Sequence, residues 1–130
     1  MRSIARQKLG YFPLSPTEAE RIRRFLVFSD EETNVLDPCA GTGSALATLT
    51  LDARVVRHAI ELDAFRAEEA VKVVGRVIQG NCFDVHCAVE SFSVLFLNPP
   101  YDQEISDSRN SRMERLLLEH TYRWLNQQGF

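Results

Sequence analysis

The 130-residue sequence predicts one α/β domain, a doubly wound, mainly parallel sheet of about four strands with helices on both faces. Three observations support this fold class. Short apolar runs alternate with stretches of helical periodicity, which is typical of parallel strands joined by right-handed crossover helices. The run "SVLFL" at 93–97 is almost continuously apolar, as expected for a strand that helices cover on both faces. The apolar run that ends at Asp37 leads directly into the glycine-containing turn "DPCAGTGS".

The individual elements follow from the changes in hydrophobic period. Ser15 can cap a first helix that begins at Pro16, and Glu18 completes a capping box, so we expect a helix over 16–28. The further expected elements are strands at 34–37, 54–62, 76–79 and 92–97, and helices at 43–51, 64–73 and 112–127. In a doubly wound sheet these strands take the order 3-2-1-4. Residues 1–32 then form an N-terminal arm and helix, and 33–130 the sheet core.

The composition is that of a soluble globular domain, with 45% apolar and 25% charged residues. A net charge of −3 provides no global basic field, so attraction to a nucleic acid would have to come from local patches or another chain. Three cysteines, Cys39, Cys82 and Cys87, leave an odd thiol under any pairing. No secretory signal or long apolar span is recognisable, so we expect a reduced, cytoplasmic protein without a membrane partner.

The turn after the first strand is the first candidate for a binding site, because ligands of such sheets lie at the carboxyl ends of the strands. Gly41 and Gly43 remove side chains where the backbone turns sharply and approaches a bound molecule. The helix that follows points free N–H groups toward that molecule. Leu46 stands where a dinucleotide fingerprint needs a small residue, which argues against a nicotinamide cofactor. A plain turn into a helix explains the two glycines equally well.

The ends of the second and third strands carry further polar side chains. Glu61 ends the second strand, where a carboxylate can accept hydrogen bonds from both hydroxyls of a ribose, although an ordinary solvated acid is the alternative. Asp63 is expected to cap the next helix. After the third strand, Asn81 can donate and accept at a purine edge, and Cys82 or Phe83 can pack on the ring.

The fourth strand runs into "NPPY" at 98–101, where the hydrogen bonding of the sheet must stop. Pro99 and Pro100 have no N–H group, so the backbone carbonyls of Asn98 and Pro99 stay available as acceptors. The side-chain oxygen of Asn98 adds a third acceptor, and Tyr101 offers a flat face for stacking. Such a cluster can bind both hydrogens of an amino group and leave its nitrogen lone pair free to attack an electrophile.

Five motifs, in this order, carry a resemblance that covers nearly the whole chain: "FPLSP", "VLDPCAGTG", "IELD", "GNCFD" and "FLNPPYD". The chain resembles Rossmann-type S-adenosylmethionine-dependent methyltransferases with an Asn-Pro-Pro-Tyr signature, and among them adenine-N6 DNA methyltransferases. The resemblance implies S-adenosylmethionine as cofactor. It implies the cofactor-binding residues Tyr11, Phe12, Pro13, Asp37, Pro38, Ala40, Gly41, Thr42, Gly43, Glu61, Leu62, Asn81, Cys82, Phe83 and Asn98, and the catalytic residues Asn98, Pro99, Pro100 and Tyr101.

The resemblance also implies a role for each group. Asp37 and the glycines would contact the methionine portion, Glu61 the ribose, and Asn81, which stands where the family usually has Asp, the adenine. Asn98 and the carbonyl of Pro99 would hold the target amine, most simply N6 of an adenine flipped out of duplex DNA and stacked on Tyr101. Methylation of an RNA base or of a protein glutamine amide, or a cofactor-binding module without turnover, are the alternatives.

Other charged and metal-binding patterns carry weaker expectations. Cys82, His86 and Cys87 are three crowded ligands without a fourth, so we predict no metal site. The run "RIRR" at 21–24 is expected to be a solvated helix face rather than a phosphate contact. The stretch 106–112, "SDSRNSR", has the composition of a loop and could bring Arg109 and Arg112 near a substrate phosphate.

The last residues predict an incomplete sheet. Gly129 can cap the final helix, and Phe130 would then open a fifth strand. We therefore expect a chain truncated before that strand, with the outer edge of the fourth strand exposed. A second copy or another partner chain could cover this edge.

Overall fold

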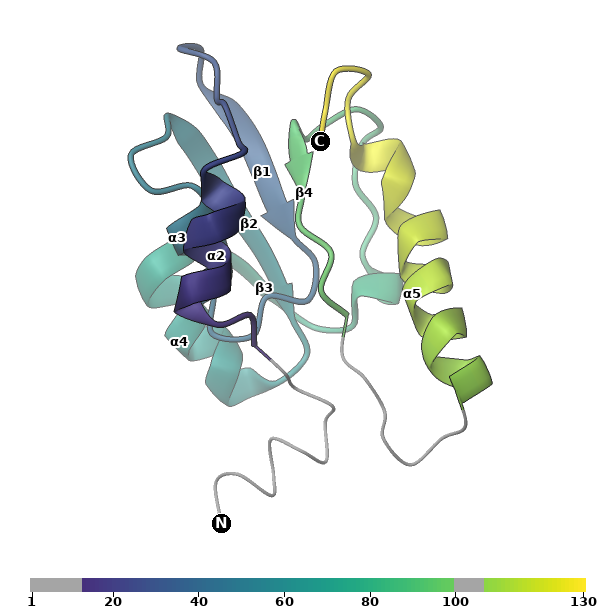
Figure 1. The fold of residues 1–130 in the computed structure, drawn as a ribbon. Helices are drawn as coiled ribbons and strands as arrows, with labels where there is room; N and C mark the ends of the chain where they lie inside the picture. The colour runs from purple at the N-terminus through teal and green to yellow at the C-terminus, as the bar shows by residue number, and fades with distance from the viewer. Residues whose placement is uncertain (1–12, 100–106) are drawn as a thin grey trace.

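A computed structural model of the chain describes residues 13–99 and 107–130, with side chains from residue 113 onward in the second stretch. Four parallel strands form one sheet in the order β3-β2-β1-β4, which confirms the predicted topology (Figure 1). The strands are β1 (Thr33–Asp37), β2 (Val55–Glu61), β3 (Arg76–Gln79) and β4 (Val94–Leu95). The helices are α2 (Pro16–Arg23), α3 (Ser44–Leu49), α4 (Ala64–Val74) and α5 (Asp107–Thr121), with 3₁₀ turns η1 (Cys82–Asp84) and η2 (Tyr122–Trp124).

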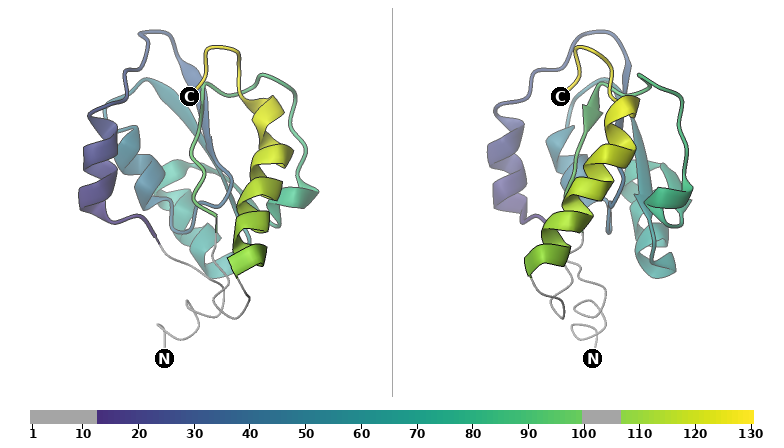
Figure 2. Two further views of the ribbon diagram at one scale, coloured as in Figure 1. Left: turned by 45° about the vertical axis from the view of Figure 1, so that its right-hand side comes forward. Right: turned by 90° about the vertical axis from the view of Figure 1, so that its right-hand side faces the viewer.

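Helices cover both faces of the sheet, α2, α3 and α4 on one side and α5 on the other (Figures 1 and 2). Neighbouring residues of the central strands therefore belong to different cores. On the side of α3 and α4 the core consists of Val35, Ala40, Leu46, Ala59 and Val74. On the side of α5 it consists of Leu36, Ile60, Cys82, Phe92, Leu117 and Trp124. Burial on both faces explains why the strands read as apolar runs without polar alternation.

The predicted helix caps are present. The side chain of Ser15 accepts a hydrogen bond from the N–H of Glu18 at 3.2 Å, and that of Asp63 accepts one from the N–H of Arg66 at 2.9 Å. The carboxylate of Glu18 pairs with Arg21 at 3.2 Å on the exposed face of α2 rather than with the N–H of Ser15, so the expected capping box is only half formed. The sequence therefore determines both helix starts through a side chain that satisfies a free N–H group.

The end of α2 differs from the prediction, because the helix stops at Arg23 rather than near residue 28. A turn follows, with a hydrogen bond from the N–H of Phe25 to the carbonyl of Ile22 at 2.9 Å. This turn leaves Phe25 and Val27 exposed and brings Phe28 against the core on the α3 side. The apolar spacing over 25–28 therefore reflects the partly buried contact of Phe28 with the core, not a further helical turn.

The last helix is also shifted relative to the prediction. α5 begins at Asp107, so the expectation of a loop is wrong for residues 107–112. Serine, asparagine and aspartate favour loops only weakly, and packing of the helix on the sheet overrides that preference. The helix ends at Thr121, well before residue 127, because the chain then turns back to β4. There the N–H of Asn126 donates to the carbonyl of Phe92 at 2.8 Å.

The outer edge of β4 is paired within the chain, which corrects the expectation that it is exposed. Toward β1, the N–H of Ser93 donates to the carbonyl of Asn34 at 2.8 Å, and the N–H of Phe96 donates to the carbonyl of Leu36 at 2.9 Å. Only Val94–Leu95 form regular strand, fewer residues than the predicted 92–97. On the outer side, the N–H of Phe130 donates to the carbonyl of Ser93 at 2.8 Å, and its carbonyl accepts from the N–H of Leu95 at 3.0 Å. This alternation is that of a parallel partner, as expected for a residue that opens a fifth strand.

No helix within residues 13–99 and 107–130 is long and apolar enough to cross a membrane.

Candidate functional site

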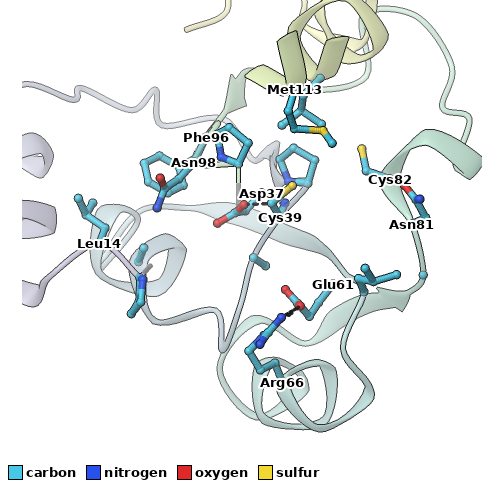
Figure 3. A pocket seen from close by; sticks show the side chains of 18 of the residues that line it. Leu14, Asp37, Cys39, Glu61, Arg66, Asn81, Cys82, Phe96, Asn98 and Met113 are labelled. Carbon is cyan, nitrogen blue, oxygen red and sulfur yellow. Dashed lines mark hydrogen bonds and ion pairs between the residues drawn. The ribbon is translucent and has the colours of Figure 1, made fainter. Parts of the chain in front are cut away.

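A pocket lies at the carboxyl ends of the strands, where all four strand ends meet the segment leading into α2 (Figure 3). It brings together residues that are far apart in the sequence. The predicted site residues that line it are Pro13, Asp37, Pro38, Ala40, Glu61, Leu62, Asn81, Cys82, Phe83, Asn98 and Pro99. The predicted residues Tyr11, Phe12, Pro100 and Tyr101 lie outside the described residues. Gly41, Thr42 and Gly43 are not among the residues that line the pocket, although Ala40 and Ser44 on either side of them are.

Asp37 is a buried carboxylate at the end of β1, with only 1% of its surface exposed. One side-chain oxygen accepts a hydrogen bond from the N–H of Cys39 at 3.1 Å. Burial raises the pKa of this carboxyl to about 7; the Cys39 N–H lowers it partly, and the negative charge of Glu61 adds to the rise. A nearby cation would therefore stabilise the ionised form of Asp37, and the pocket presents a site for a positively charged group.

Glu61 is the second buried carboxylate and connects three parts of the site. Its Oε2 accepts a hydrogen bond from the N–H of Gly41 at 2.7 Å, which ties the end of β2 to the glycine turn. Its Oε1 accepts one from the N–H of Asp63 at 3.1 Å. Oε1 also accepts from the guanidinium of Arg66, through Nε at 3.1 Å and Nη2 at 2.9 Å. A solvated acid was the alternative interpretation of this residue; its 5% exposed surface excludes it.

The glycine turn has a structural role that the sequence interpretation did not include. Gly41 and Gly43 have φ values of 59° and 80°, which side-chain-bearing residues rarely adopt. A Cβ atom on Gly43 would lie 2.6 Å from Cγ2 of Val74 and 3.1 Å from Cγ2 of Val73. Gly43 is therefore needed for the contact of the turn with α4 rather than for a wall of the pocket.

The end of β3 forms the third side of the pocket. The Oδ1 atom of Asn81 accepts a hydrogen bond from the N–H of Phe83 at 3.0 Å and so caps η1. Cys82 is buried, and Phe83 packs beside the core on the α5 side. The amide NH2 of Asn81 and the apolar residues beside it form a polar edge next to an apolar surface, an arrangement suited to a flat heterocycle.

The two cysteines of the pocket are weak acids. Burial, followed by the negative charge of Asp37, raises the pKa of the Cys39 thiol. Burial, followed by the neighbouring Cys87, raises the pKa of Cys82 to about 11. Both thiols therefore remain protonated at neutral pH. Among the described residues, no three His, Cys, Asp or Glu side chains are grouped so that they could hold a metal ion.

Asn98 and Pro99 reach the pocket from the end of β4. Phe96 still donates its N–H to the carbonyl of Leu36 at 2.9 Å, and the chain then leaves the sheet. Asn98 is half-buried and Pro99 is buried. Figure 3 shows the Asn98 side chain directed into the pocket that also contains Asp37 and Glu61. The amide group of Asn98 and the two carboxylates therefore converge on one cavity.

Some lining residues were not predicted from the sequence: Leu14, Cys39, Ser44, Ala45, Arg66, Gly80, Phe96, Met113 and Leu117. Arg66 is the one among them that carries a charge. It lies in the first turn of α4, a position that usually faces solvent, yet only 7% of its surface is exposed. The available signal was its position three residues after the helix cap Asp63, which directs its side chain back toward the end of β2.

Solved structures with a similar fold include S-adenosylmethionine-dependent methyltransferases. The methyltransferase subunit of a type I restriction-modification system from Streptococcus thermophilus matches with a TM-score of 0.70 and 18% identity, covering 93% of this chain and 33% of that chain. A methyltransferase from Geobacter sulfurreducens, solved with S-adenosyl-L-homocysteine, matches with a TM-score of 0.59 and 18% identity, covering 94% and 47%. A protein described as a class I methyltransferase from Listeria monocytogenes matches with a TM-score of 0.63 and 15% identity, covering 88% and 42%.

The chain thus spans less than half the length of these three structures. Its fold is the Rossmann-like α/β fold of S-adenosylmethionine-dependent methyltransferases, which confirms the fold that the motifs imply.

The family follows from the sequence itself. Residues 1–129 match the uncharacterised methyltransferase family DUF6094, and the chain belongs to this family. A search of curated proteins gave no match.

Proposed function

We propose that this chain binds S-adenosylmethionine in the pocket and transfers its methyl group to an exocyclic amine, with N6 of adenine in DNA as the target. One observation carries the proposal: Asn98 and Pro99 line the same pocket as Asp37 and Glu61. The first pair supplies acceptors for an amine, and the second supplies carboxylates for a cationic ligand that contains a ribose.

The residues of the pocket fit this cofactor. Asp37, buried and ionisable near neutral pH, suits the positively charged amino group of the methionine portion. Glu61 directs Oε2 toward the glycine turn, where a ribose hydroxyl can donate to it. Leu62 and Phe83 provide apolar surface for a flat ring, beside the amide of Asn81. The pocket thus offers candidate partners for the amino group, the ribose and the adenine of the cofactor.

The residues at the end of β4 orient the substrate amine. When bound, S-adenosylmethionine supplies an electrophilic methyl group on its sulfonium centre. The Asn98 side-chain oxygen and the Pro99 carbonyl accept the hydrogens of the amine and hold its lone pair toward that methyl group. The same oxygens stabilise the positive charge that develops on nitrogen, and the surplus proton then passes to solvent.

The choice of DNA as substrate has two supports. The Asn-Pro-Pro-Tyr run and its neighbouring motifs resemble those of adenine-N6 DNA methyltransferases. A subunit of a restriction-modification system is among the structures with a similar fold. The net charge of −3 is unfavourable for nucleic-acid binding, so DNA attraction depends on local positive groups or on a second chain.

Calorimetry and methyl transfer test this proposal together. We expect the chain to bind S-adenosylmethionine and to transfer labelled methyl groups to unmethylated genomic DNA. Asn98→Ala should lower the transfer rate by roughly a hundredfold or more while the Kd of the cofactor changes little, because the side chain acts on the amine. Gln128→Ala, which removes an exposed amide elsewhere, is the matched control.

The other outcomes are distinct. Transfer only to RNA or to protein would replace DNA as the target class. Cofactor binding without transfer to any substrate would identify a binding module. Equal losses of transfer and cofactor affinity in Asn98→Ala would contradict the role of that residue, and the absence of cofactor binding would overturn the proposal.

A further inference from the structure

The ion pair between Arg66 and Glu61 lies inside the candidate pocket. The two side chains are 9% and 6% exposed, and both residues line the cavity (Figure 3). A buried ion pair at a binding site is costly to assemble, since both charges lose their hydration. The geometry of this pair determines which part of the Glu61 carboxylate can still bind a ligand.

The donors around Glu61 are distributed unequally between its two oxygens. A carboxylate has about four acceptor positions, two on each oxygen. Oε1 receives three donors: Nε and Nη2 of Arg66 at 3.1 and 2.9 Å, and the N–H of Asp63 at 3.1 Å. Oε2 receives only the N–H of Gly41, at 2.7 Å. Oε1 is therefore saturated, and one acceptor position remains on Oε2.

A ribose presents two neighbouring hydroxyls, and a carboxylate that accepts from both usually offers one oxygen to each. Glu61 cannot do so while Arg66 occupies Oε1. Two constraints fix the arrangement: Arg66 is held in the first turn of α4, and the N–H of Asp63, the cap of that helix, donates to the same oxygen. The carboxylate is thus anchored on one side by α4 and exposed to the pocket on the other.

We propose that Arg66 is a positioning residue that withholds Oε1 of Glu61 from the ligand, so that Glu61 recognises a single ribose hydroxyl of the cofactor through Oε2. This inference rests on the proposed function, because it concerns how the same pocket selects its cofactor. Arg66 acts only through Glu61 in this role. The positive charge of Arg66 also compensates the negative charge of Glu61. Of the two carboxylates Glu61 and Asp37, only Asp37 therefore has no cationic side chain bonded to it.

The test uses analogues of S-adenosylhomocysteine that lack either the 2′- or the 3′-hydroxyl. We expect the wild-type chain to lose roughly tenfold or more in affinity for one analogue, because a hydrogen bond to a charged group is removed, and to bind the other almost as tightly as the parent compound. In Arg66→Gln the freed Oε1 can accept the second hydroxyl, so the difference between the two analogues should shrink. If Arg66 had a purely structural role, Arg66→Gln would lower the affinity for all three ligands by the same factor.

Two variants control for effects on folding. Arg66→Lys keeps the charge but cannot form both bonds, and Lys72→Gln removes an exposed ion pair with Glu69 on the same helix. Lys72→Gln should leave the ratio of the two analogue affinities at its wild-type value. Thermal unfolding of each variant shows whether it is folded at the temperature of the measurement.

The failure of this inference can be distinguished from that of the proposed function. If the wild-type chain binds the parent compound but loses the same affinity for both analogues, Glu61 accepts both hydroxyls and the inference is overturned, while the proposed function stands. If S-adenosylhomocysteine itself does not bind, both are overturned.

Discussion

Asp37 makes the pocket sensitive to pH. Its carboxyl is buried, and its pKa is raised to about 7, chiefly by desolvation. A small change in pH near neutrality therefore changes the charge that the free site presents to a ligand.

The affinity for S-adenosylmethionine should consequently rise with pH between about 6 and 8. The cationic amino group binds the ionised carboxylate, and in the free protein this form increases from a minor to the major species across that interval. Because the α-amino group of the ligand itself begins to lose its proton near pH 8, the net change in Kd should be roughly fourfold. Calorimetric titrations at several pH values measure this. Asp37→Asn should bind weakly and without this pH dependence; a wild-type Kd that is constant from pH 6 to 8 would contradict the assignment.

The same residue lowers the stability of the ligand-free protein. Between pH 3.8 and about 7 the unfolded chain releases the proton that the folded protein keeps, so the free energy of unfolding falls as the pH rises. Above pH 7 both the folded and the unfolded protein have released the proton, so the free energy of unfolding falls no further. Asp37→Asn should therefore be more stable than the wild type at pH 8, by an amount on the order of a few kcal/mol, and the gain should be smaller at pH 5. Urea denaturation at the two pH values tests the sign.

At the scale of elements, the glycine turn and α4 support each other. Gly43 combines a φ of 80° with a close approach to Val74. Gly43→Ala should destabilise the fold by about 1–3 kcal/mol, since the new methyl group meets both an unfavourable backbone conformation and the side chain of Val74. Thermal unfolding measures the effect.

Gly80→Ala is the control for this substitution. Gly80 also lies at a strand end and lines the pocket, but a Cβ atom there would meet no atom within 4 Å. A change in stability equal to that of Gly43→Ala would show that the contact with α4 is not the cause.

The sequence was sufficient for β1, β2 and β3, for the strand order and for the two helix starts, whereas β4 is shorter than predicted. The helix starts depend on local signals. Ser15 and Asp63 cap their helices through side chains only three residues from the N–H group they bind. The ends of α2 and α5 depend on distant partners instead. Phe28 is drawn to the core, and Asn126 to Phe92, and neither contact is visible in a local pattern.

The residues of the candidate site also differ in whether the sequence alone could predict them. Residues at strand ends could be predicted, because parallel strands bring their carboxyl ends to one edge. Arg66 could not, since an arginine in a first helical turn is normally solvated, and only the folded chain reveals its bonds to Glu61. The "RIRR" run matches the expectation only in part: Arg21 pairs with Glu18 on an exposed helix face, whereas Arg23 donates to the carbonyl of Leu51 at 3.0 Å and pairs with Asp52 at 3.6 Å.

At the scale of the whole molecule, the two edges of the sheet differ. β3 forms one edge, with three of its four residues exposed. The outer side of β4 is occupied by the chain itself, through residues 124–130. A second chain could pair with β4 only after these residues had moved away.

Amide hydrogen exchange tests this pairing. The N–H groups of Phe92 and Leu95 donate to the carbonyls of Trp124 and Phe130 at 2.9 and 3.0 Å, so both should exchange slowly. The N–H of Phe96, which donates to Leu36 inside the sheet, is the internal reference for protection. Exchange of Leu95 at the rate of an exposed loop would show that Phe130 does not hold this edge in solution.

The weak acidity of the two thiols in the pocket determines how they would respond to the proposed cofactor. A thiolate is the strongest nucleophile that an ordinary side chain can offer, and one placed beside a methyl sulfonium would be alkylated and would inactivate its own site. With a pKa of about 11 for Cys82, and a raised pKa for Cys39, both sulfurs stay protonated and unreactive. If the pocket binds S-adenosylmethionine as proposed, the burial that shapes the cavity would thus also protect both thiols from methylation.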